Sequence, residues 1–403
     1  LAARFAPSEQ RRVRLQTEGL RVVNPESVRA VFDDALRGAT SDGAIRRAVD
    51  ALYATDDFEL VGTRIERHDG IDEIVVEPHE KAWGPNYLRP GLALSTDLGG
   101  ASSFTLALDY RRTWLNRRGL EWHSTVSAGE VTGVRSELIQ PIDVARRWLA
   151  SGYIDAQQRV DEFFSGGNAL SRLRDRVGRI GVEARRELST TAELRLGVRR
   201  SRFDTAAVTG IEPANLDGDT SEAYAGLLID RLDNWDFPRR GTLLAADLTL
   251  ASRVFSGDFV YRKADVRVMQ AFGGGRHSFS IMLRHGSALG TDLPLFDAFD
   301  LGGFQNLSGF GDRQILANGI TFGRLVYSYR IGESGPFTRG IYLGGSLEAA
   351  SVHEPLNRTD TLRDVLASSL YVAADTAFGP FYLGTGFGEG GERTVYLFLG
   401  TPR

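Results

Sequence analysis

The residues that could do chemistry in this 403-residue chain do not assemble into a known catalytic pattern. A serine hydrolase of the nucleophile-elbow type needs Gly-x-Ser-x-Gly, which presents the hydroxyl on a tight turn beside oxyanion-stabilising amides. Gly332-Glu-Ser-Gly-Pro336 and Gly344-Gly-Ser-Leu-Glu348 both fail at the last position. Asp42-Gly43-Ala44 carries the letters of the matching aspartate motif, but it has no serine partner. We therefore expect no catalytic residue, and no enzyme, in this chain.

Metal and acid–base chemistry are equally unsupported. The chain has no cysteine, which excludes a thiol nucleophile and thiolate ligands. Its six histidines have no His-Glu-x-x-His spacing, so we expect neither a metal nor a cofactor. The charged residues Glu183, Arg185 and Glu187 lie close together in the sequence. Such groups can act as acids and bases, but here the pattern favours a solvated, ion-paired lining.

Composition and charge narrow the class of protein. The net charge is −4 with 25% charged residues, which argues against a nucleic-acid partner. No run approaches the ~18 apolar residues of a membrane-spanning helix. No signal peptide is visible at Leu1, so we expect residues 1–10 to be a linker from an upstream domain.

Residues 11–80 are predicted to form a small mixed unit. Alternating residues from Arg11 indicate a strand, and Asn24-Pro25 is a typical helix start. A second helix is expected after a cap at Thr40 or Ser41, with its apolar residues on one face. Two strands joined near His68-Asp-Gly70 follow. The predicted order is strand, helix, helix, strand, strand, with both helices on one face of the sheet.

The apolar period changes to two after Tyr87. One face of each segment is apolar and the other is charged or rich in glycine, as in Phe104–Arg111. We count sixteen such segments. They start near Tyr87, Ser102, Gly119, Val134, Trp148, Leu170, Thr191, Ser221, Gly241, Asp258, Arg276, Asn318, Gly340, Asp364, Gly379 and Glu392.

These segments predict a sixteen-stranded antiparallel transmembrane β-barrel over residues 81–403. Several have ten residues or more, and about 9–11 tilted residues cross a bilayer. Short connections alternate with long ones, as in outer-membrane barrels. The alternative is a soluble β-sandwich or β-propeller. A sandwich would have to bury the broad apolar face against protein, whereas a bilayer covers it and barrel closure pairs the backbone.

The longest connection, between the eleventh and twelfth segments, contains Asp300-Leu-Gly-Gly-Phe-Gln-Asn-Leu-Ser-Gly-Phe-Gly-Asp312. A loop of about thirty residues is normally functional or disordered. This one carries too many large apolar residues for a solvated linker. We expect it to fold back inside the barrel. The apolar residues are Leu295, Phe296, Phe299, Leu301, Phe304, Leu307 and Phe310.

With these elements placed, the chain resembles a known superfamily. Residues 11–80 resemble a polypeptide-transport-associated (POTRA) domain, and residues 87–403 resemble the barrel of the BamA/TamA superfamily of assembly and secretion proteins. Two motifs carry the barrel resemblance. One is the turn before the ninth strand, with Asp233, Asn234, Pro238 and Gly241. The other is the loop motif Gly302, Gly303, Leu307, Ser308, Gly309 and Phe310.

Within that superfamily, the chain is most similar to type Vd autotransporters, patatin-like phospholipases fused to a POTRA domain and a barrel. The stretch Pro78–Tyr87 is similar to their junction between POTRA domain and barrel. The chain departs from the superfamily at Ser308, where an arginine is usual. In the superfamily that arginine is thought to hold the loop to acidic residues of the wall. A serine cannot make this charge-assisted bond, so we expect the attachment to be lost or different.

The resemblance implies an outer-membrane protein of a Gram-negative bacterium with a periplasmic POTRA domain. It would anchor or translocate a fused passenger or an extended client strand. Implied partners are outer-membrane lipids and the outer-membrane assembly machinery; a homodimer is left open. One alternative is the membrane-anchoring half of a phospholipase whose catalytic domain lies upstream. The other is a passive porin-like channel.

Overall fold

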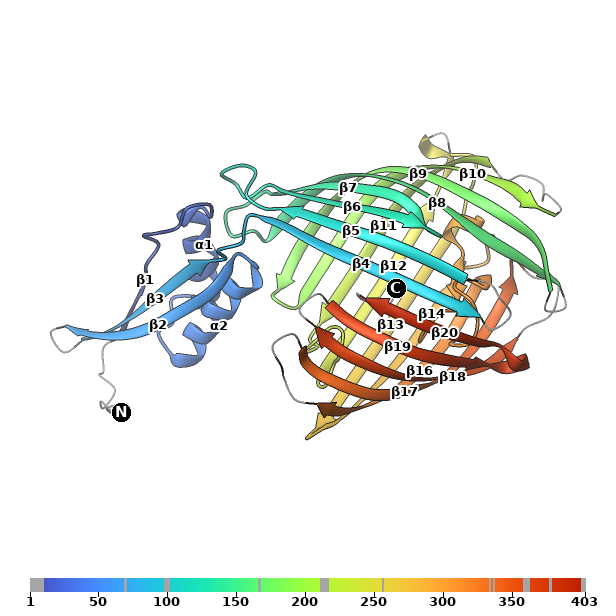
Figure 1. Cartoon of the computed structure of the whole chain (residues 1–403). Helices are drawn as coiled ribbons and strands as arrows, with labels where there is room; N and C mark the ends of the chain where they lie inside the picture. The colour runs from blue at the N-terminus through green and yellow to red at the C-terminus, as the bar shows by residue number, and fades with distance from the viewer. Residues whose placement is uncertain are drawn as a thin grey trace.

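The computed structural model describes residues 11–68, 71–97, 102–165, 168–210, 217–255, 257–332, 335, 338–357, 363–376 and 379–399. It has two parts: a small N-terminal unit, and a closed barrel with this unit beyond one of its ends (Figure 1). The hairpin residues Asp69 and Gly70 lie outside the described residues.

The N-terminal unit (residues 11–80) has the predicted order of elements. These are β1 (Arg11–Leu15), α1 (Pro25–Leu36), α2 (Asp42–Ala54), β2 (Phe58–His68) and β3 (Ile71–Glu80). The side chain of Asn24 caps α1 with Pro25 in the first turn, and Ser41 caps α2. The helices therefore start where the sequence predicts.

The sheet of this unit has the order β1-β3-β2, with β1 parallel and β2 antiparallel to the central strand β3. Both helices contribute to one core, in which Phe32 and Leu52 pack with Val61 and Val76. Strand β2 is an edge of the sheet. Ile65 on it is 69% exposed, so the helices leave the far part of this strand uncovered. Within the described residues, no helix has the length and apolar character to span a membrane.

The barrel contains sixteen long strands in the described residues, eleven before the long loop and five after it. A three-residue strand, β15 (Phe299–Leu301), lies in the loop and pairs with β16. The long strands are β4 (Asn86–Asp97), β5 (Ser102–Arg112), β6 (Glu121–Gly129), β7 (Thr132–Pro141), β8 (Trp148–Ser165), β9 (Asn168–Ser189), β10 (Ala192–Thr209), β11 (Asp217–Asp230), β12 (Gly241–Ala251), β13 (Arg262–Gly274), β14 (His277–Ser287), β16 (Ile315–Gly332), β17 (Thr338–Pro355), β18 (Asp364–Thr376), β19 (Gly379–Gly388) and β20 (Arg393–Leu399). Short 3-10 turns are η1 (Arg253–Phe255), η2 (Leu295–Asp297) and η3 (Glu389–Gly391).

All sixteen predicted strands are present, each starting within four residues of its predicted start. Neighbouring strands pair antiparallel throughout, and β20 pairs with β4 to close the sheet. The two-residue period is also confirmed. On β17, Leu343 and Leu347 are 52% and 64% exposed on the outer face, whereas Ser346 and Glu348 are buried on the inner face. The outer surface is a broad apolar belt, which indicates a hydrocarbon environment.

The closing seam is short. Strands β20 and β4 pair from Thr394 opposite Asp97 to Leu399 opposite Leu92, which is six residue pairs. Strands β8 and β9 pair from Trp148 to Ser165, along the whole of β8. In the described residues the seam is thus the shortest pairing between long strands, and Pro90 on β4 has no N–H to offer a neighbour.

Candidate functional site: the lumen loop and its anchors

The first anchor of the connection between β14 and β16, here called the lumen loop (residues 288–314), is one carboxylate of the wall. Oε2 of Glu348 on β17 accepts the backbone N–H groups of Leu307 (2.7 Å) and Ser308 (2.6 Å). Its Oε1 accepts the hydroxyl of Ser308 (2.8 Å) and that of Ser346. Glu348 is 3% exposed, so water does not compete well for these bonds. Hydrogen bonds to a charged group contribute about 1.5–3 kcal/mol each.

The loop backbone lies directly on the inner face of β19. A Cβ placed on Gly309 would lie 2.2 Å from the backbone N of Gly388, and one on Gly386 would lie 2.3 Å from the N of Gly309. Gly309 also has φ +98°, a conformation that favours glycine. Its N–H donates to the Tyr396 hydroxyl on β20 (3.0 Å), and this hydroxyl donates to the carbonyl of Phe310 (3.1 Å). The loop therefore contacts the strand that closes the barrel.

Gly302 and Gly303 make the turn that closes the loop on itself. Their φ angles are +120° and +93°, and a Cβ on Gly302 would lie 2.0 Å from the carbonyl oxygen of Gly311. The N–H of Gly303 donates to the carbonyl of Phe310 (3.0 Å). The turn points Phe304 into an aromatic cluster, with ring centroids 5.6 Å from Tyr371 and 5.3 Å from Tyr396.

A second anchor lies on another part of the wall. The carboxylate of Asp297, in η2, accepts the hydroxyl of Tyr261 (2.8 Å) and the ammonium of Lys263 (3.0 Å). The guanidinium of Arg199 on β10 lies 3.7 Å away. A third anchor is a two-bond ion pair between Arg313 and Asp161 on β8, at 3.0 and 3.2 Å. Three sectors of the wall thus hold the loop across the lumen.

The turn between β11 and β12 enters the same lumen from the end nearer the N-terminal unit. The Asp233 carboxylate accepts the N–H groups of residues 239 and 240, and the Asn234 side chain accepts those of residues 236 and 237. Pro238 follows the buried Phe237, and Gly241 has φ +111° with no room for a Cβ beside the carbonyl of Arg231.

The turn and the lumen loop meet inside the barrel. The Phe237 ring stacks on Tyr342, with centroids 4.4 Å apart and planes 9° apart, and lies 5.4 Å from Tyr382. Phe304 of the lumen loop lies 5.6 Å from the same Tyr382. The two sequence motifs, sixty residues apart, therefore join in one aromatic cluster that occupies the lumen.

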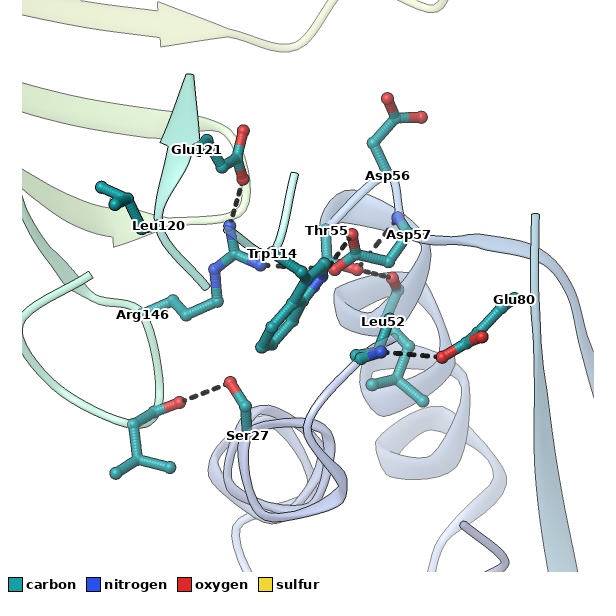
Figure 2. A network of polar contacts seen from close by, with 12 residues as sticks. Ser27, Leu52, Thr55, Asp56, Asp57, Glu80, Trp114, Leu120, Glu121 and Arg146 are labelled. Atoms are coloured by element: carbon teal, nitrogen blue, oxygen red, sulfur yellow. Dashed lines mark hydrogen bonds and ion pairs between the residues drawn. The ribbon is translucent and has the colours of Figure 1, made fainter. Parts of the chain in front are cut away.

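The N-terminal unit is joined to the barrel through Asp57, between α2 and β2 (Figure 2). Its Oδ1 accepts the indole N–H of Trp114 (2.9 Å), and its Oδ2 accepts Arg146 (3.3 Å). Trp114 lies in the β5–β6 turn and Arg146 in the β7–β8 turn, where it also pairs with Glu121 (2.5 Å). Burial raises the pKa of Asp57, while the charge of Arg146 and the Trp114 hydrogen bond act to lower it.

Helix α1 contacts the same two turns. The hydroxyl of Ser27 donates to the carbonyl of Val144 (3.1 Å), and the Asn24 amide donates to the carbonyl of Arg117 (2.9 Å). Asn24 thus caps α1 with its oxygen and binds the barrel with its nitrogen. These contacts set one orientation of the unit.

Residues 86–348, about two thirds of the chain, match the Omp85 superfamily domain. The chain belongs to the Omp85 superfamily. Barrels of this superfamily are outer-membrane proteins of Gram-negative bacteria. No curated protein sequence matches the chain.

Solved structures share the fold of this Omp85 barrel at low sequence identity. BamA from Haemophilus ducreyi lacking POTRA domains 1–3 is 13% identical with a TM-score of 0.65, covering 96% of this chain and 83% of that one. CdiB from Acinetobacter baumannii is 12% identical with a TM-score of 0.63, covering 97% and 73%. CdiB from Escherichia coli is 10% identical with a TM-score of 0.66, covering 96% and 75%.

The structure places both motifs of this Omp85 chain in the lumen, and of the two outcomes expected at Ser308, a lost or a different attachment, it shows a different one. The loop does not lose its attachment at Ser308, because two backbone N–H groups and the serine hydroxyl bind the carboxylate of Glu348. The wall partners were missed from the sequence. Glu348, Asp297 and Arg313 look like ordinary charges of a polar strand face or loop, and nothing in their spacing singles them out.

No catalytic or metal site emerges from the described part of the chain. No group of three His, Asp or Glu side chains is placed to hold a metal ion there. Asp42 lies at the start of α2, where it pairs with Arg11 (2.6 Å). The charged residues Glu183 and Arg185 form a lumenal ion pair that extends to Glu137. An ion-paired lining is what the sequence favoured for these groups.

Proposed function

We propose that this Omp85 barrel anchors or translocates a passenger, with residues 11–80 acting as a periplasmic POTRA domain that receives extended chain segments. The observation that carries the proposal is the three-sector attachment of the lumen loop through Glu348, Asp297 and Arg313. A loop bound across the lumen in this way obstructs an aqueous path, which disfavours a passive porin. The remaining places where a client strand could pair are the short β20–β4 seam of the barrel and the free edge of the N-terminal sheet.

The orientation of the barrel supports a periplasmic N-terminal unit. The end near the unit has two-residue connections between β9 and β10 and between β13 and β14, and its longest, between β11 and β12, spans residues 231–240. The opposite end carries the long lumen loop. Short periplasmic turns and long external loops are the rule for barrels of this membrane.

The edge strand β2 is the proposed client site. No strand pairs with its outer side among the described residues, although the N–H of Val61 donates to the hydroxyl of Tyr53 on α2 (2.8 Å). Leu60 and Ile65 on this strand are 54% and 69% exposed. An extended segment can add to such an edge through backbone hydrogen bonds. Its side chains would alternate between the two faces of the sheet, with Leu60 beside one set and Ile65 beside the other.

The proposal also concerns which passenger the barrel carries. A patatin-like lipase domain upstream of Leu1 is suggested by the resemblance to type Vd autotransporters, most directly through Pro78–Tyr87. Sequencing the region upstream of Leu1 tests it: a Gly-x-Ser-x-Gly elbow there supports the lipase, and its absence removes it without touching the barrel.

The main proposal is tested with a folded reporter domain fused ahead of Leu1. We expect the fusion to fractionate with the outer membrane and to show heat-modifiable migration on a gel. Recovery of the intact fusion in the soluble fraction would overturn the anchoring role.

The client site on β2 is tested by cross-linking an unfolded apolar test peptide. Ile65→Lys should weaken the cross-linking, and Glu59→Lys, also on β2, serves as the matched control. Equal cross-linking in both variants would show that β2 is not the client site.

A further inference from the structure

We propose that the outer face of β9 and β10, at the end away from the N-terminal unit, binds the phosphate of an anionic membrane lipid. The site is a cluster of five arginines, here called the arginine patch: Arg172, Arg174 and Arg176 on β9, and Arg200 and Arg202 on β10. It depends on the barrel lying in a membrane and is independent of any passenger.

The arginine patch begins where the apolar belt ends. Along the outer face of β9, Arg176 is followed by Gly178, then by Ile180 and Val182, which are 61% and 57% exposed. On β10, Arg200 is preceded by Val198 at 48% exposed. The change from apolar to cationic side chains is therefore sharp on both strands.

The height of the belt fits a bilayer with lipid headgroups at the patch. Arg186 lies ten residues after Arg176 on the same face, and its guanidinium stacks on Trp148 at 4.6 Å. Ten residues of a strand tilted by about 40° rise about 25 Å, the usual height of the apolar band. Arg176 and Arg186 thus mark the two edges of the hydrocarbon.

The patch has an open centre at Gly178. A Cβ at this position would meet nothing within 4 Å. Arg202 lies directly opposite Gly178 in the β9–β10 register, Arg200 lies opposite Ile180, and Arg176 is two residues away on the same face. Three guanidinium groups therefore extend from around an unfilled space, and Ala156 on β8 borders it on the other side.

Not all the positive charge of the arginine patch is neutralised by ion pairs within the protein. Arg172 pairs with Glu162 at 3.4 Å, Arg176 with Asp204 at 3.6 Å and Arg200 with Asp219 at 3.1 Å. Arg174 and Arg202 have no ion pair in the described part of the chain, and the Nε of Arg174 has no hydrogen-bond partner.

These pairs are weak enough to exchange. The side chains of Arg172, Arg176 and Arg200 are 54%, 57% and 50% exposed, and exposed ion pairs are readily rearranged. Asp217 lies opposite Asp204, so the acidic groups repel one another at the distal edge of the patch.

The chemistry of the site selects a lipid headgroup. Arginine forks match phosphate oxygens in geometry and charge. Because the apolar belt continues directly below Gly178, the acyl chains of a bound lipid would lie along Ala156 and Ile154, the latter 56% exposed. A free anion would bind the arginine guanidinium groups but would make no apolar contact with this surface.

Native mass spectrometry of the full chain in non-ionic detergent tests the proposal, with phosphatidylglycerol and phosphatidylcholine as probes. We expect the protein to prefer phosphatidylglycerol. The double variant Arg176→Gln/Arg202→Gln should bind it more weakly, by about five-fold for each arginine removed. The control Arg118→Gln, an exposed arginine at the opposite end, should match the unaltered protein. Heat-modifiable migration verifies that each variant is folded.

A second variant keeps the charge and fills the space. Gly178→Leu places an apolar side chain on a lipid-facing position, so the barrel should fold, yet phosphatidylglycerol binding should fall. Inorganic phosphate at the concentration of the lipid should not displace it. Equal phosphatidylglycerol affinity of the double variant and the unaltered protein would overturn the proposal. Displacement by inorganic phosphate would also overturn it, since the site would then belong to a free anion.

Discussion

Ser308 of the lumen loop and Glu348 of strand β17 form the central attachment inside the barrel, through a hydroxyl bond of 2.8 Å and a backbone N–H bond of 2.6 Å. Ser308 is completely buried. A Cβ on Gly386 would lie 2.9 Å from the Cβ of Ser308, so the loop approaches β19 this closely only because residue 386 is glycine. Serine therefore suits this close loop–wall contact, and the positive charge of the loop is placed at Arg313 instead.

Removing the Glu348 carboxylate should release the loop. In Glu348→Ala the buried N–H groups of Leu307 and Ser308 lose their acceptor, which costs about 2–5 kcal/mol of unfolding free energy. Urea unfolding in detergent, followed by heat-modifiable migration, measures this loss. Glu193→Ala is the control, because Glu193 faces the lumen without an ion pair or hydrogen bond in the described residues. Equal midpoints for the two variants would contradict the anchor.

The contact between Gly309 and β19 predicts a second large effect. Gly309→Ala combines an unfavourable φ of +98° with a clash against the backbone of Gly388. Gly390→Ala is the matched control, since Gly390 has φ +81° but open space around it. We expect the control to lose about 1 kcal/mol and Gly309→Ala at least about 2 kcal/mol more. If both lose the same stability, the loop does not lie on β19 as described.

The orientation of the N-terminal unit should depend on Trp114. The chain has no cysteine, so two introduced cysteines, at Arg46 and Arg118, can be spin-labelled without background. The unaltered contacts predict one narrow distance distribution between the labels. Trp114→Ala removes the hydrogen bond to Asp57 and the support for Arg146, and should broaden it. Leu115→Ala, at the exposed neighbouring position, should leave the distance distribution narrow. A narrow distribution in Trp114→Ala would show that Trp114 does not fix the N-terminal unit to the barrel.

The same labels test a pH effect. Because burial raises the pKa of Asp57, the docked unit binds a proton that the free unit lacks at the same pH. The contribution of Asp57 to docking is therefore largest below its ordinary pKa of 3.8 and is lost as the pH rises through the raised value. The groups facing Asp57 are Arg146, Arg111, Glu121 and Trp114. Asp57→Asn keeps a hydrogen-bond acceptor for Trp114 but should abolish the part of the pH dependence of docking that comes from Asp57. Identical pH responses in Asp57→Asn and the unaltered protein would refute this effect.

The sequence predicted the strands of the barrel well because each one has a lipid face and a lumen face. The two-residue apolar period alone predicts that β12 begins at Gly241 and β18 at Asp364, and these are the observed first residues of both strands. The errors are largest for β11 and β13, predicted from Ser221 and Asp258 and observed from Asp217 and Arg262. These strands have charged residues on both faces at their outer ends, so the alternation fades there.

The anchors could not be predicted for a different reason. Ser308 and Glu348 are 40 residues apart, and Asp161 is 152 residues from Arg313, so only barrel closure brings these groups together. Asp57 and Trp114 likewise belong to separate parts of the chain. The large apolar residues of the loop predicted that it folds back inside the barrel, but a single sequence holds no sign of which wall residues it would meet.

Conductance of the purified full chain in a planar lipid bilayer tests most directly whether the lumen loop closes the barrel. We expect no steady channel current from the unaltered protein. Glu348→Ala and a deletion of Gly302–Phe310 should both produce open-channel steps at the same voltage. A large, steady current from the unaltered protein, equal to that of the deletion, would show that the pore is open and that the lumen loop does not close it.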